Sequence, residues 1–265
     1  MTDTTPAVGT VRSADGTTIA YERSGEGPAM VLVGGAFNDR STTRAVAAAL
    51  AGDFTVFGYD RRGRGDSGDT APYAVRREIE DLAALIEAAG GTAYLYGVSS
   101  GAILAALATA AGLPVAGLAL FEPPFQVGPR AGSGTALAPR LAELVAAGRR
   151  GDAVECFLLD AVGIPADQVR GMRDQPMWPW LELMAPSLVH DATVTGDGTL
   201  PAELLAGISV PTVVVESTGS PDWLRDAAGA TAGAVPGARR VSLAGGFHEV
   251  PAELLAVELR RFLRS

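Results

Sequence analysis

Short apolar runs alternate with segments of helical composition along most of this chain. A continuous apolar run is typical of a strand that is covered on both faces of a sheet. The predicted strands are residues 17–23, 29–33, 54–59, 93–96, 115–121, 210–216 and 239–243. The first of them follows Asp15-Gly16, a hairpin signal, and is expected to be antiparallel. The alternation of strands and helices predicts a mostly parallel sheet with helices on both faces.

The region between about residues 128 and 200 differs, because it contains helical stretches but no convincing strand. These stretches are residues 136–147, 152–162, 166–173 and 180–185, separated by glycine and proline. We interpret the region as a helical cap inserted into an α/β core. The predicted organisation is a core of residues 1–127 and 201–265, interrupted by a cap of residues 128–200. The other predicted helices are residues 41–51, 73–89, 102–108, 221–234 and 251–263.

The fourth apolar run leads into Gly-x-Ser-x-Gly at residues 97–101, and a strong helix former follows. Strand, tight turn and helix in this order form the context of a nucleophile elbow. Gly97 and Gly101 have no Cβ, so the strand and the helix can close around the serine. The helix then directs its N-terminal amides toward an oxygen that Ser99 attacks. Ser99 is therefore the candidate nucleophile.

A base for this serine is expected at the end of another strand, because ligands of parallel sheets bind outside the carboxyl strand ends. The chain has two histidines, His190 and His248. His248 lies between the last predicted strand and the last predicted helix, where a short loop can bring its imidazole to the elbow. His190 falls at the end of the predicted cap, and we interpret it as structural or pocket-lining.

An acid is needed to orient the histidine, and the sequence offers three candidates. In most proteins of this design the acid follows the strand after the cap, but this chain has Ser220 there and Asp222 two residues later. Glu122 ends the strand after the elbow helix, and the prolines that follow cannot continue that strand. We favour Glu122 as the acid, with Asp222 as the alternative and Glu216 behind both.

The donors for an oxyanion are expected to be backbone amides. Ala36 follows two glycines after a predicted strand, and Ser100 follows the nucleophile. The predicted cap also contains an apolar stretch with Trp178 and Trp180, which are candidates for the pocket wall; packing of the cap on the core is the alternative. The other candidates for the pocket are Gly35, Phe37 and Phe125.

Composition excludes several classes of function. The 265 residues are 48% hydrophobic, which is enough for one large core, and the net charge of −9 argues against nucleic-acid and anionic-membrane partners. All 21 basic residues are arginine, which excludes Schiff-base chemistry on lysine and a Walker-type phosphate site. The single cysteine, Cys156, excludes an internal disulfide and a cysteine-based zinc cluster. No apolar run is long enough for a membrane span and no secretion signal begins the chain, so we expect a cytoplasmic protein.

The elbow at residues 97–101, the Asp-Arg-Arg-Gly-Arg-Gly-Asp-Ser loop at residues 60–67 and the late His248 resemble the α/β-hydrolase superfamily over nearly the whole chain. The loop corresponds to a segment of that family, and we interpret it as structural. More narrowly, Ser-Ser-Gly at the elbow, a glutamate after the next strand and tryptophans in the cap resemble the zearalenone-lactone hydrolases. That resemblance implies nucleophile, base and acid at Ser99, His248 and Glu122.

The expected function is a serine hydrolase that cleaves an ester or lactone of a fairly apolar small molecule. No metal and no organic cofactor is implied. One alternative uses the same residues as a carbon–carbon bond hydrolase, a lyase or a polyketide-tailoring cyclase. Another is a binding protein on the same fold, since a fold does not determine a function. The sequence leaves open whether the chain forms a homodimer.

Overall fold

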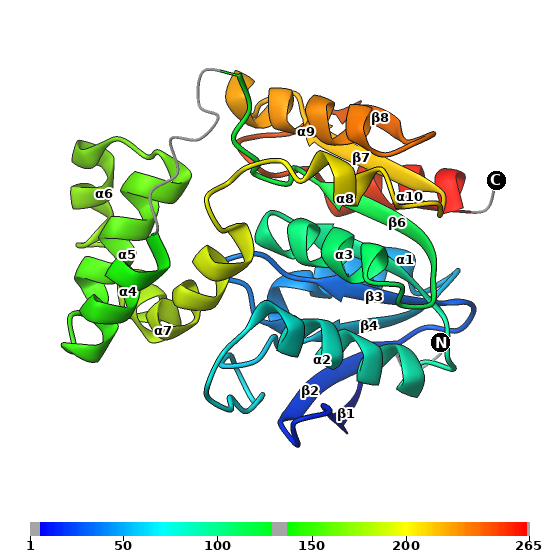
Figure 1. Ribbon diagram of the computed structural model, residues 1–265, viewed down its shortest axis with the longest axis horizontal. Helices are drawn as coiled ribbons and strands as arrows, with labels where there is room; N and C mark the ends of the chain where they lie inside the picture. The colour runs from blue at the N-terminus through cyan, green and yellow to red at the C-terminus, as the bar shows by residue number, and fades with distance from the viewer. Residues whose placement is uncertain (1–5, 129–136, 264–265) are drawn as a thin grey trace.

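The computed structural model describes residues 6–128 and 137–263, and an eight-stranded sheet forms the centre of this part of the chain (Figure 1). The strand order is β1-β2-β4-β3-β5-β6-β7-β8. The strands are β1 (Ala7–Arg12), β2 (Thr18–Ser24), β3 (Ala29–Val33), β4 (Thr55–Tyr59), β5 (Ala93–Val98), β6 (Val115–Phe121), β7 (Thr212–Ser217) and β8 (Arg239–Leu243). The β1–β2 and β2–β4 pairs are antiparallel and the other pairs are parallel, which confirms the predicted mostly parallel sheet. Strand β1 was not among the predicted strands.

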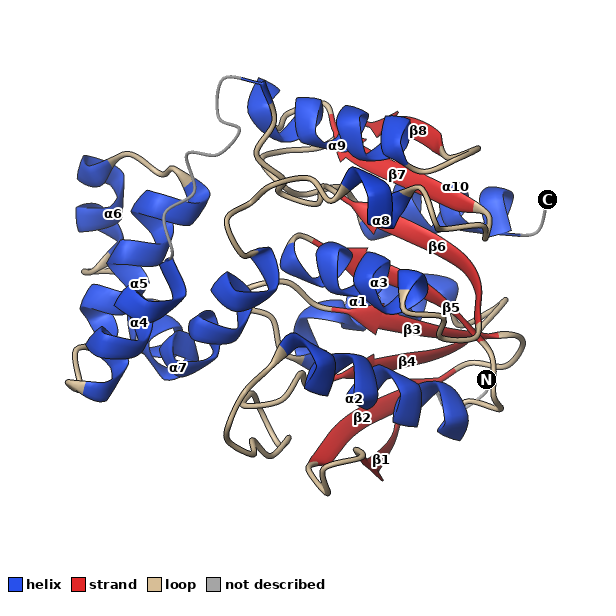
Figure 2. Ribbon diagram, in the orientation of Figure 1, coloured by secondary structure: helices blue, strands red, loops and turns tan. Residues whose placement is uncertain are grey.

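Helices cover both faces of the sheet, as predicted (Figure 2). Successive side chains of a strand point to opposite faces, so Val31 of β3 packs in one apolar cluster and Leu32 in the other. The first cluster includes buried residues of α2 (Val75–Ala88), α3 (Ser100–Ala110) and α9 (Asp222–Ala234). The second includes residues of α1 (Arg44–Leu50) and α10 (Ala252–Leu263). The short helix α8 (Ala202–Leu205) precedes β7.

The segment between β6 and β7 is helical, and no strand occurs in its described residues. Its helices before α8 are α4 (Leu137–Ala146), α5 (Arg150–Phe157), α6 (Ala166–Met172) and α7 (Trp178–Thr195), with a π-helical turn at Leu158–Val162. They form a third apolar cluster beside the carboxyl ends of the strands, seen at the left of Figure 1. The domain limits 127/128 and 200/201 stay predictions, and residues 129–136 of the predicted cap lie outside the described residues.

Helix α7 is longer than the predicted 180–185 because it continues through Pro186. Proline inside a helix removes a hydrogen bond and costs about 3 kcal/mol. The turns after Pro186 bury Leu188 and Ala192 in the third apolar cluster, and this burial offsets the cost. The helix therefore reaches the sheet and carries His190 and Asp191 to it.

Within residues 6–128 and 137–263, no helix combines the length and the apolar character that crossing a bilayer requires.

Candidate active site

Four residues with an unusual backbone conformation lie at the carboxyl ends of the strands. Phe37 follows β3, Ser99 follows β5, and Glu122 follows β6. His248 follows β8. Their φ angles are 57°, 56°, 46° and 53°, and no other non-glycine residue in the described part of the chain has a positive φ. Since such strained backbone clusters at functional sites, these strand ends form the candidate active site.

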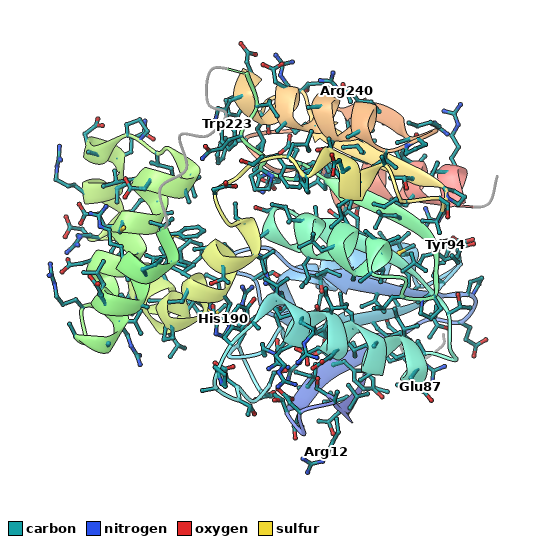
Figure 3. All side chains as sticks on the ribbon, in the orientation of Figure 1. Arg12, Glu87, Tyr94, His190, Trp223 and Arg240 are labelled. Carbon is teal, nitrogen blue, oxygen red and sulfur yellow. The ribbon has the colours of Figure 1, made fainter. Side chains whose placement is uncertain are left out.

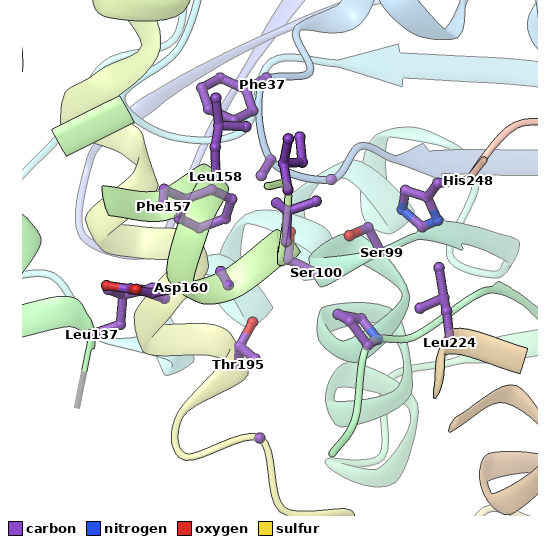
Figure 4. Close-up of a pocket in the computed structure, with 18 of the residues that line it drawn as sticks. Phe37, Ser99, Ser100, Leu137, Phe157, Leu158, Asp160, Thr195, Leu224 and His248 are labelled. Atoms are coloured by element: carbon purple, nitrogen blue, oxygen red, sulfur yellow. The ribbon is translucent and has the colours of Figure 1, made fainter. Parts of the chain in front are cut away.

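Ser99 lies on the corner between β5 and α3, with φ 56° and ψ −126°. Its backbone N–H donates to the carbonyl of Phe121 at 2.9 Å, which ties the corner to the neighbouring strand. A Cβ on Gly97 would collide with the backbone of Gly101 and Ala102, so only glycine allows this close approach of strand and helix. The side chain of Ser99 lies in the pocket wall, at the N-terminus of α3 (Figure 4).

Glu122 and His248 are in direct contact, although 126 residues separate them. Oε2 of Glu122 lies 2.6 Å from Nδ1 of His248. Glu122 is fully buried, and its other oxygen, Oε1, accepts the backbone N–H of Ser217 at 2.8 Å. When Nδ1 of the imidazole donates to this carboxylate, Nε2 is the nitrogen left to accept a proton. His248 and Ser99 line the same pocket (Figure 4).

Asp222, the alternative acid, lies elsewhere. It is the first residue of α9, its side chain is 86% exposed, and it accepts a hydrogen bond from Arg225 at 2.6 Å. Glu216 is also occupied, because its Oε2 pairs with Arg240 and its Oε1 accepts the hydroxyl of Ser242. Of these three carboxylates, Glu122 is the one that contacts His248.

The loop that contains His248 is held by two serines that sequence reasoning did not single out for this role. Oγ of Ser220 accepts the backbone N–H of His248 at 2.9 Å. The hydroxyl of Ser217 donates to the carbonyl of Gly246 at 2.6 Å. Both serines lie at or after the end of β7, where most proteins of this design have the acid. The sequence has no carboxylate at the expected position after this strand, and that absence is the signal that could have pointed to Ser217 and Ser220.

The two predicted oxyanion donors lie on either side of Ser99. In the described part of the chain, neither a backbone nor a side-chain acceptor takes the N–H of Ala36. Ser100 is the first residue of α3, and the first N–H groups of a helix have no acceptor within it. Both residues line the pocket, so their amides can receive an anionic oxygen formed beside Ser99.

The pocket has a volume of about 440 Å³, within the usual range of small-molecule sites. Its polar end contains Ser99, Ser100 and His248, and most of the remaining wall is apolar (Figure 4). Of the predicted wall residues, Gly35 and Phe37 line it. Apolar wall residues that the sequence did not single out include Phe157, Leu158, Ala161, Val162, Ile164, Leu224 and Phe247. Several belong to the π-helical turn after α5, an irregularity that is frequent at functional sites.

Three predicted wall residues lie outside this pocket. Phe125 is buried in the apolar cluster on one face of the sheet. Trp178 is buried among the helices of the segment between β6 and β7, and its indole N–H donates to Glu182 at 2.9 Å. Trp180 packs against the same helices. For both tryptophans the structure shows packing within the helical segment rather than contact with the pocket.

His190 packs where α7 meets the core and does not line the pocket (Figure 3). Its ring stacks on Tyr73, with centroids 3.8 Å apart and an interplanar angle of 3°. Nε2 lies 3.4 Å from Oδ2 of Asp69. Burial lowers the pKa of His190 despite the carboxylates nearby. These contacts fit the interpretation of His190 as a structural residue rather than a pocket-lining one.

The comparisons with known proteins agree with this architecture. A sequence model of the alpha/beta hydrolase family matches residues 30–257. A crystal structure of an alpha/beta hydrolase from Sphaerobacter thermophilus is 50% identical, with a TM-score of 0.90, and the match covers 96% of this chain and 99% of that one. The search of curated proteins finds no match.

Two more distant structures show the fold alone. An esterase from Rhodococcus is 24% identical over 97% of this chain and 98% of its own, with a TM-score of 0.73. An enol-lactonase from Burkholderia xenovorans is 22% identical over 96% of this chain and 100% of its own, also with a TM-score of 0.73. The predicted fold is confirmed by these matches, and the chain belongs to the alpha/beta hydrolase family.

Proposed function

We propose that this protein is a serine hydrolase that cleaves an ester or lactone of an apolar small molecule through an acyl-enzyme on Ser99. One observation carries the proposal. The fully buried carboxylate of Glu122 contacts Nδ1 of His248 at 2.6 Å, in a pocket that the histidine shares with Ser99. A nucleophile, a base and a group that orients the base are the parts that acyl transfer needs.

In the first half of the reaction, Oγ of Ser99 attacks the carbonyl carbon while Nε2 of His248 takes the hydroxyl proton. Glu122 stabilises the imidazolium that forms, because its charge lies against Nδ1. The carbonyl oxygen becomes an oxyanion, held by the N–H groups of Ala36 and Ser100. The bond to the leaving alcohol then breaks, and the alkoxide takes the proton from His248.

In the second half, water attacks the acyl-enzyme and gives a proton to Nε2 of His248. The tetrahedral intermediate collapses, the proton returns to Oγ of Ser99, and the carboxylic acid leaves. In a lactone the leaving alcohol and the acid belong to one molecule, so the product is a single hydroxy acid.

The apolar wall supports the proposed class of substrate, because Phe37, Phe157 and Leu158 offer contact to hydrocarbon and aromatic groups. Lactones, including zearalenone, are proposed within this class on the basis of the Ser–His–Glu arrangement. The helical segment between β6 and β7 is proposed to act as the cap that bounds the pocket. A cytoplasmic location stays a prediction, and whether the chain forms a homodimer stays open.

The decisive experiment combines active-site labelling with turnover. A fluorophosphonate is expected to label Ser99, located by mass spectrometry of the digested protein, and Ser99→Ala is expected to remove the label. The wild-type protein is expected to hydrolyse a p-nitrophenyl ester of a short acid with a burst of p-nitrophenol, and the Ser99→Ala variant is not. Esters and lactones of different sizes then define the substrate range.

The outcomes separate the proposal from its alternatives. Absence of both adduct and turnover in the folded wild type would favour a ligand-binding protein. An adduct on Ser99 without hydrolysis of any ester or lactone would favour carbon–carbon bond cleavage, a lyase or a cyclase, in which His248 transfers protons without an acyl-enzyme.

A further inference from the structure

A cluster of charged side chains is buried directly behind the pocket. Arg61 and Arg64 come from the loop after β4, and Asp191 comes from α7; each is at most 2% exposed. Arg61 also forms a two-pronged contact with Glu78, with both distances at 2.6 Å. Burying a charge is costly unless it is paired, and here Arg61 pairs with Glu78 and Asp191, and Arg64 pairs with Asp191.

The carboxylate of Asp191 collects three donors. Oδ1 accepts from Arg61 at 2.7 Å and from the hydroxyl of Ser100 at 2.6 Å. Oδ2 accepts from Arg64 at 2.5 Å. Burial alone would raise the pKa of Asp191, but the charges of Arg64 and Arg61 outweigh it and lower the pKa below its ordinary value. Asp191 is therefore ionised at neutral pH and holds both guanidinium groups.

The same two arginines reach the loop that contains Ala36. Nη1 of Arg64 donates to the carbonyl of Gly35 at 2.5 Å and to that of Asn38 at 3.0 Å. Nη1 of Arg61 donates to the carbonyl of Gly34 at 3.2 Å. The carbonyls of Gly34 and Gly35 belong to the two peptides on either side of Gly35, so the arginines hold both peptides of that short loop.

The contact of Arg64 with Gly35 determines the direction of one oxyanion donor. The carbonyl of Gly35 and the N–H of Ala36 belong to one peptide group, which is trans, and in a trans peptide they point in opposite directions. A guanidinium that holds the carbonyl on the buried side turns the N–H to the other side, toward the pocket. A hydrogen bond to the carbonyl also polarises the peptide, which makes its N–H a better donor.

The second oxyanion donor is held by the same carboxylate. Ser100 carries the other N–H, and its hydroxyl donates to Oδ1 of Asp191. One acidic side chain on α7 thus supports Ala36 through Arg64 and supports Ser100 directly.

We propose that Arg64 is a positioning residue that aims the N–H of Ala36 at the oxyanion, and that Asp191 of α7 holds Arg64 and Ser100 in place for this purpose. The proposal rests on the function proposed above. It extends the site from the residues that touch substrate to a layer of charged residues behind them.

The chain contains a matched control in Arg62. It belongs to the same loop and is fully buried, and it pairs with Asp81 at 2.7 Å and 2.8 Å. Its other partners are Asp15, Ser13 and the carbonyl of Arg77, none of which lines the pocket. Replacing Arg62 removes a buried arginine from the same loop without touching the oxyanion donors.

The test compares Arg64→Met with Arg62→Met in the full-length protein. Turnover of the p-nitrophenyl ester and inhibition by an alkylboronic acid are measured, because the boronic acid forms a tetrahedral anionic adduct on the serine. For Arg64→Met, kcat is expected to fall about 10- to 100-fold and the inhibition constant to rise by a similar factor, with KM within about threefold. For Arg62→Met, all three are expected to stay within about threefold of wild type.

Folding is checked by circular dichroism and by Tm, which we expect both substitutions to lower. If either methionine variant fails to fold, Arg64→Lys and Arg62→Lys replace them, because lysine keeps the charge beside the carboxylates but loses the forked geometry. Two outcomes would overturn the positioning role of Arg64 and leave the proposed function standing. One is an equal loss of kcat in the Arg64 and Arg62 variants, and the other is an unchanged inhibition constant of the boronic acid in the Arg64 variant. A folded wild type without turnover or boronic acid binding would overturn the proposed function, and this inference with it.

Discussion

The ring of Phe121 stacks on the imidazole of His248, with centroids 5.5 Å apart and 12° between the planes. The next residue along the chain, Glu122, contacts Nδ1 of the same imidazole. The end of β6 thus supplies both an apolar surface for the ring and a charged partner for its edge. Phe121 thus restrains the position of the imidazole, and Glu122 restrains its orientation.

We expect Glu122→Gln to lower kcat by about 10³- to 10⁴-fold, because the amide no longer stabilises the imidazolium and no longer selects its tautomer. Asp222→Asn is the matched control, since Asp222 is exposed and pairs with Arg225, and its kcat is expected to stay within about twofold. Steady-state kinetics on one ester measures both. A large loss of kcat in Asp222→Asn together with a small loss in Glu122→Gln would instead assign Asp222 as the acid.

Ser220→Ala is expected to lower kcat about fivefold, since a neutral hydrogen bond contributes about 1 kcal/mol and here it holds the backbone of His248. Ser242→Ala is the control, because this serine donates to Glu216 and not to the histidine loop. Kinetics and Tm are compared for the two variants. An equal effect on kcat in both would rule out a specific role for Ser220.

Gly35→Ala is expected to lower kcat by at least about 100-fold, because the added methyl would lie 2.9 Å from Cβ of Ser99 and 2.9 Å from the carbonyl of Val98. The oxyanion loop must then move away from the nucleophile. Gly171→Ala in α6 is the control, since nothing lies within 4 Å of the added carbon. It is expected to stabilise the protein by about 0.5–1 kcal/mol in urea unfolding with unchanged kcat.

Phe157→Ala is expected to raise KM for apolar esters several-fold, because Phe157 lines the pocket and its ring meets Phe37 edge-on at 5.6 Å. Trp178→Ala is expected to lower the free energy of unfolding by about 3–5 kcal/mol and to leave KM of the folded protein unchanged. Kinetics with a series of acyl chain lengths, together with urea unfolding, separates the two roles. A larger change in KM from the tryptophan would return it to the pocket wall.

The free energy of unfolding is expected to decrease as pH falls below about 6.5, and His190 is the cause. Burial lowers the pKa of His190 in the folded protein, so between that pKa and about 6.5 the unfolded chain binds a proton that the folded chain does not. His190→Phe keeps the stacking on Tyr73 and is expected to flatten this decrease in the pH range just below 6.5. Urea unfolding at several pH values measures the slope for each protein, and identical slopes would contradict the assignment.

The parts of the site that could be predicted are those with a local or positional signal. The strand, turn and helix around Ser99 all lie within residues 93–110. The two glycines of the motif could be explained by the close approach of strand and helix that they permit. Glu122 and His248 could be predicted because the ends of parallel strands meet at one edge of the sheet. The choice between Glu122 and Asp222 depended on which of the two loops faces the imidazole. In the structure, Glu122 contacts His248.

The parts that could not be predicted depend on contacts between distant residues. The contacts of Arg64, in the loop at residues 60–67, could not be predicted, because its partner Asp191 is 127 residues away in the sequence. For Trp178 and Trp180 the sequence left both the pocket wall and packing of the cap open, because apolar composition alone does not say which side of a helix faces a cavity. The length of α7 was missed for a similar reason, since packing of Leu188 overrides the break that Pro186 signals.

The contacts of Asp191 also have a consequence for how substrate reaches the pocket. Moving α7 outward would strip two buried guanidinium groups of a shared counter-charge, at a cost of roughly 3–5 kcal/mol. Substrate is therefore expected to enter past Phe247, a lining residue outside α7 whose side chain is 51% exposed. In this arrangement α7 stays in place on the core, and the helices packed on its outer part open locally more often. Amide hydrogen exchange should accordingly be slower at the end of α7 than in α5.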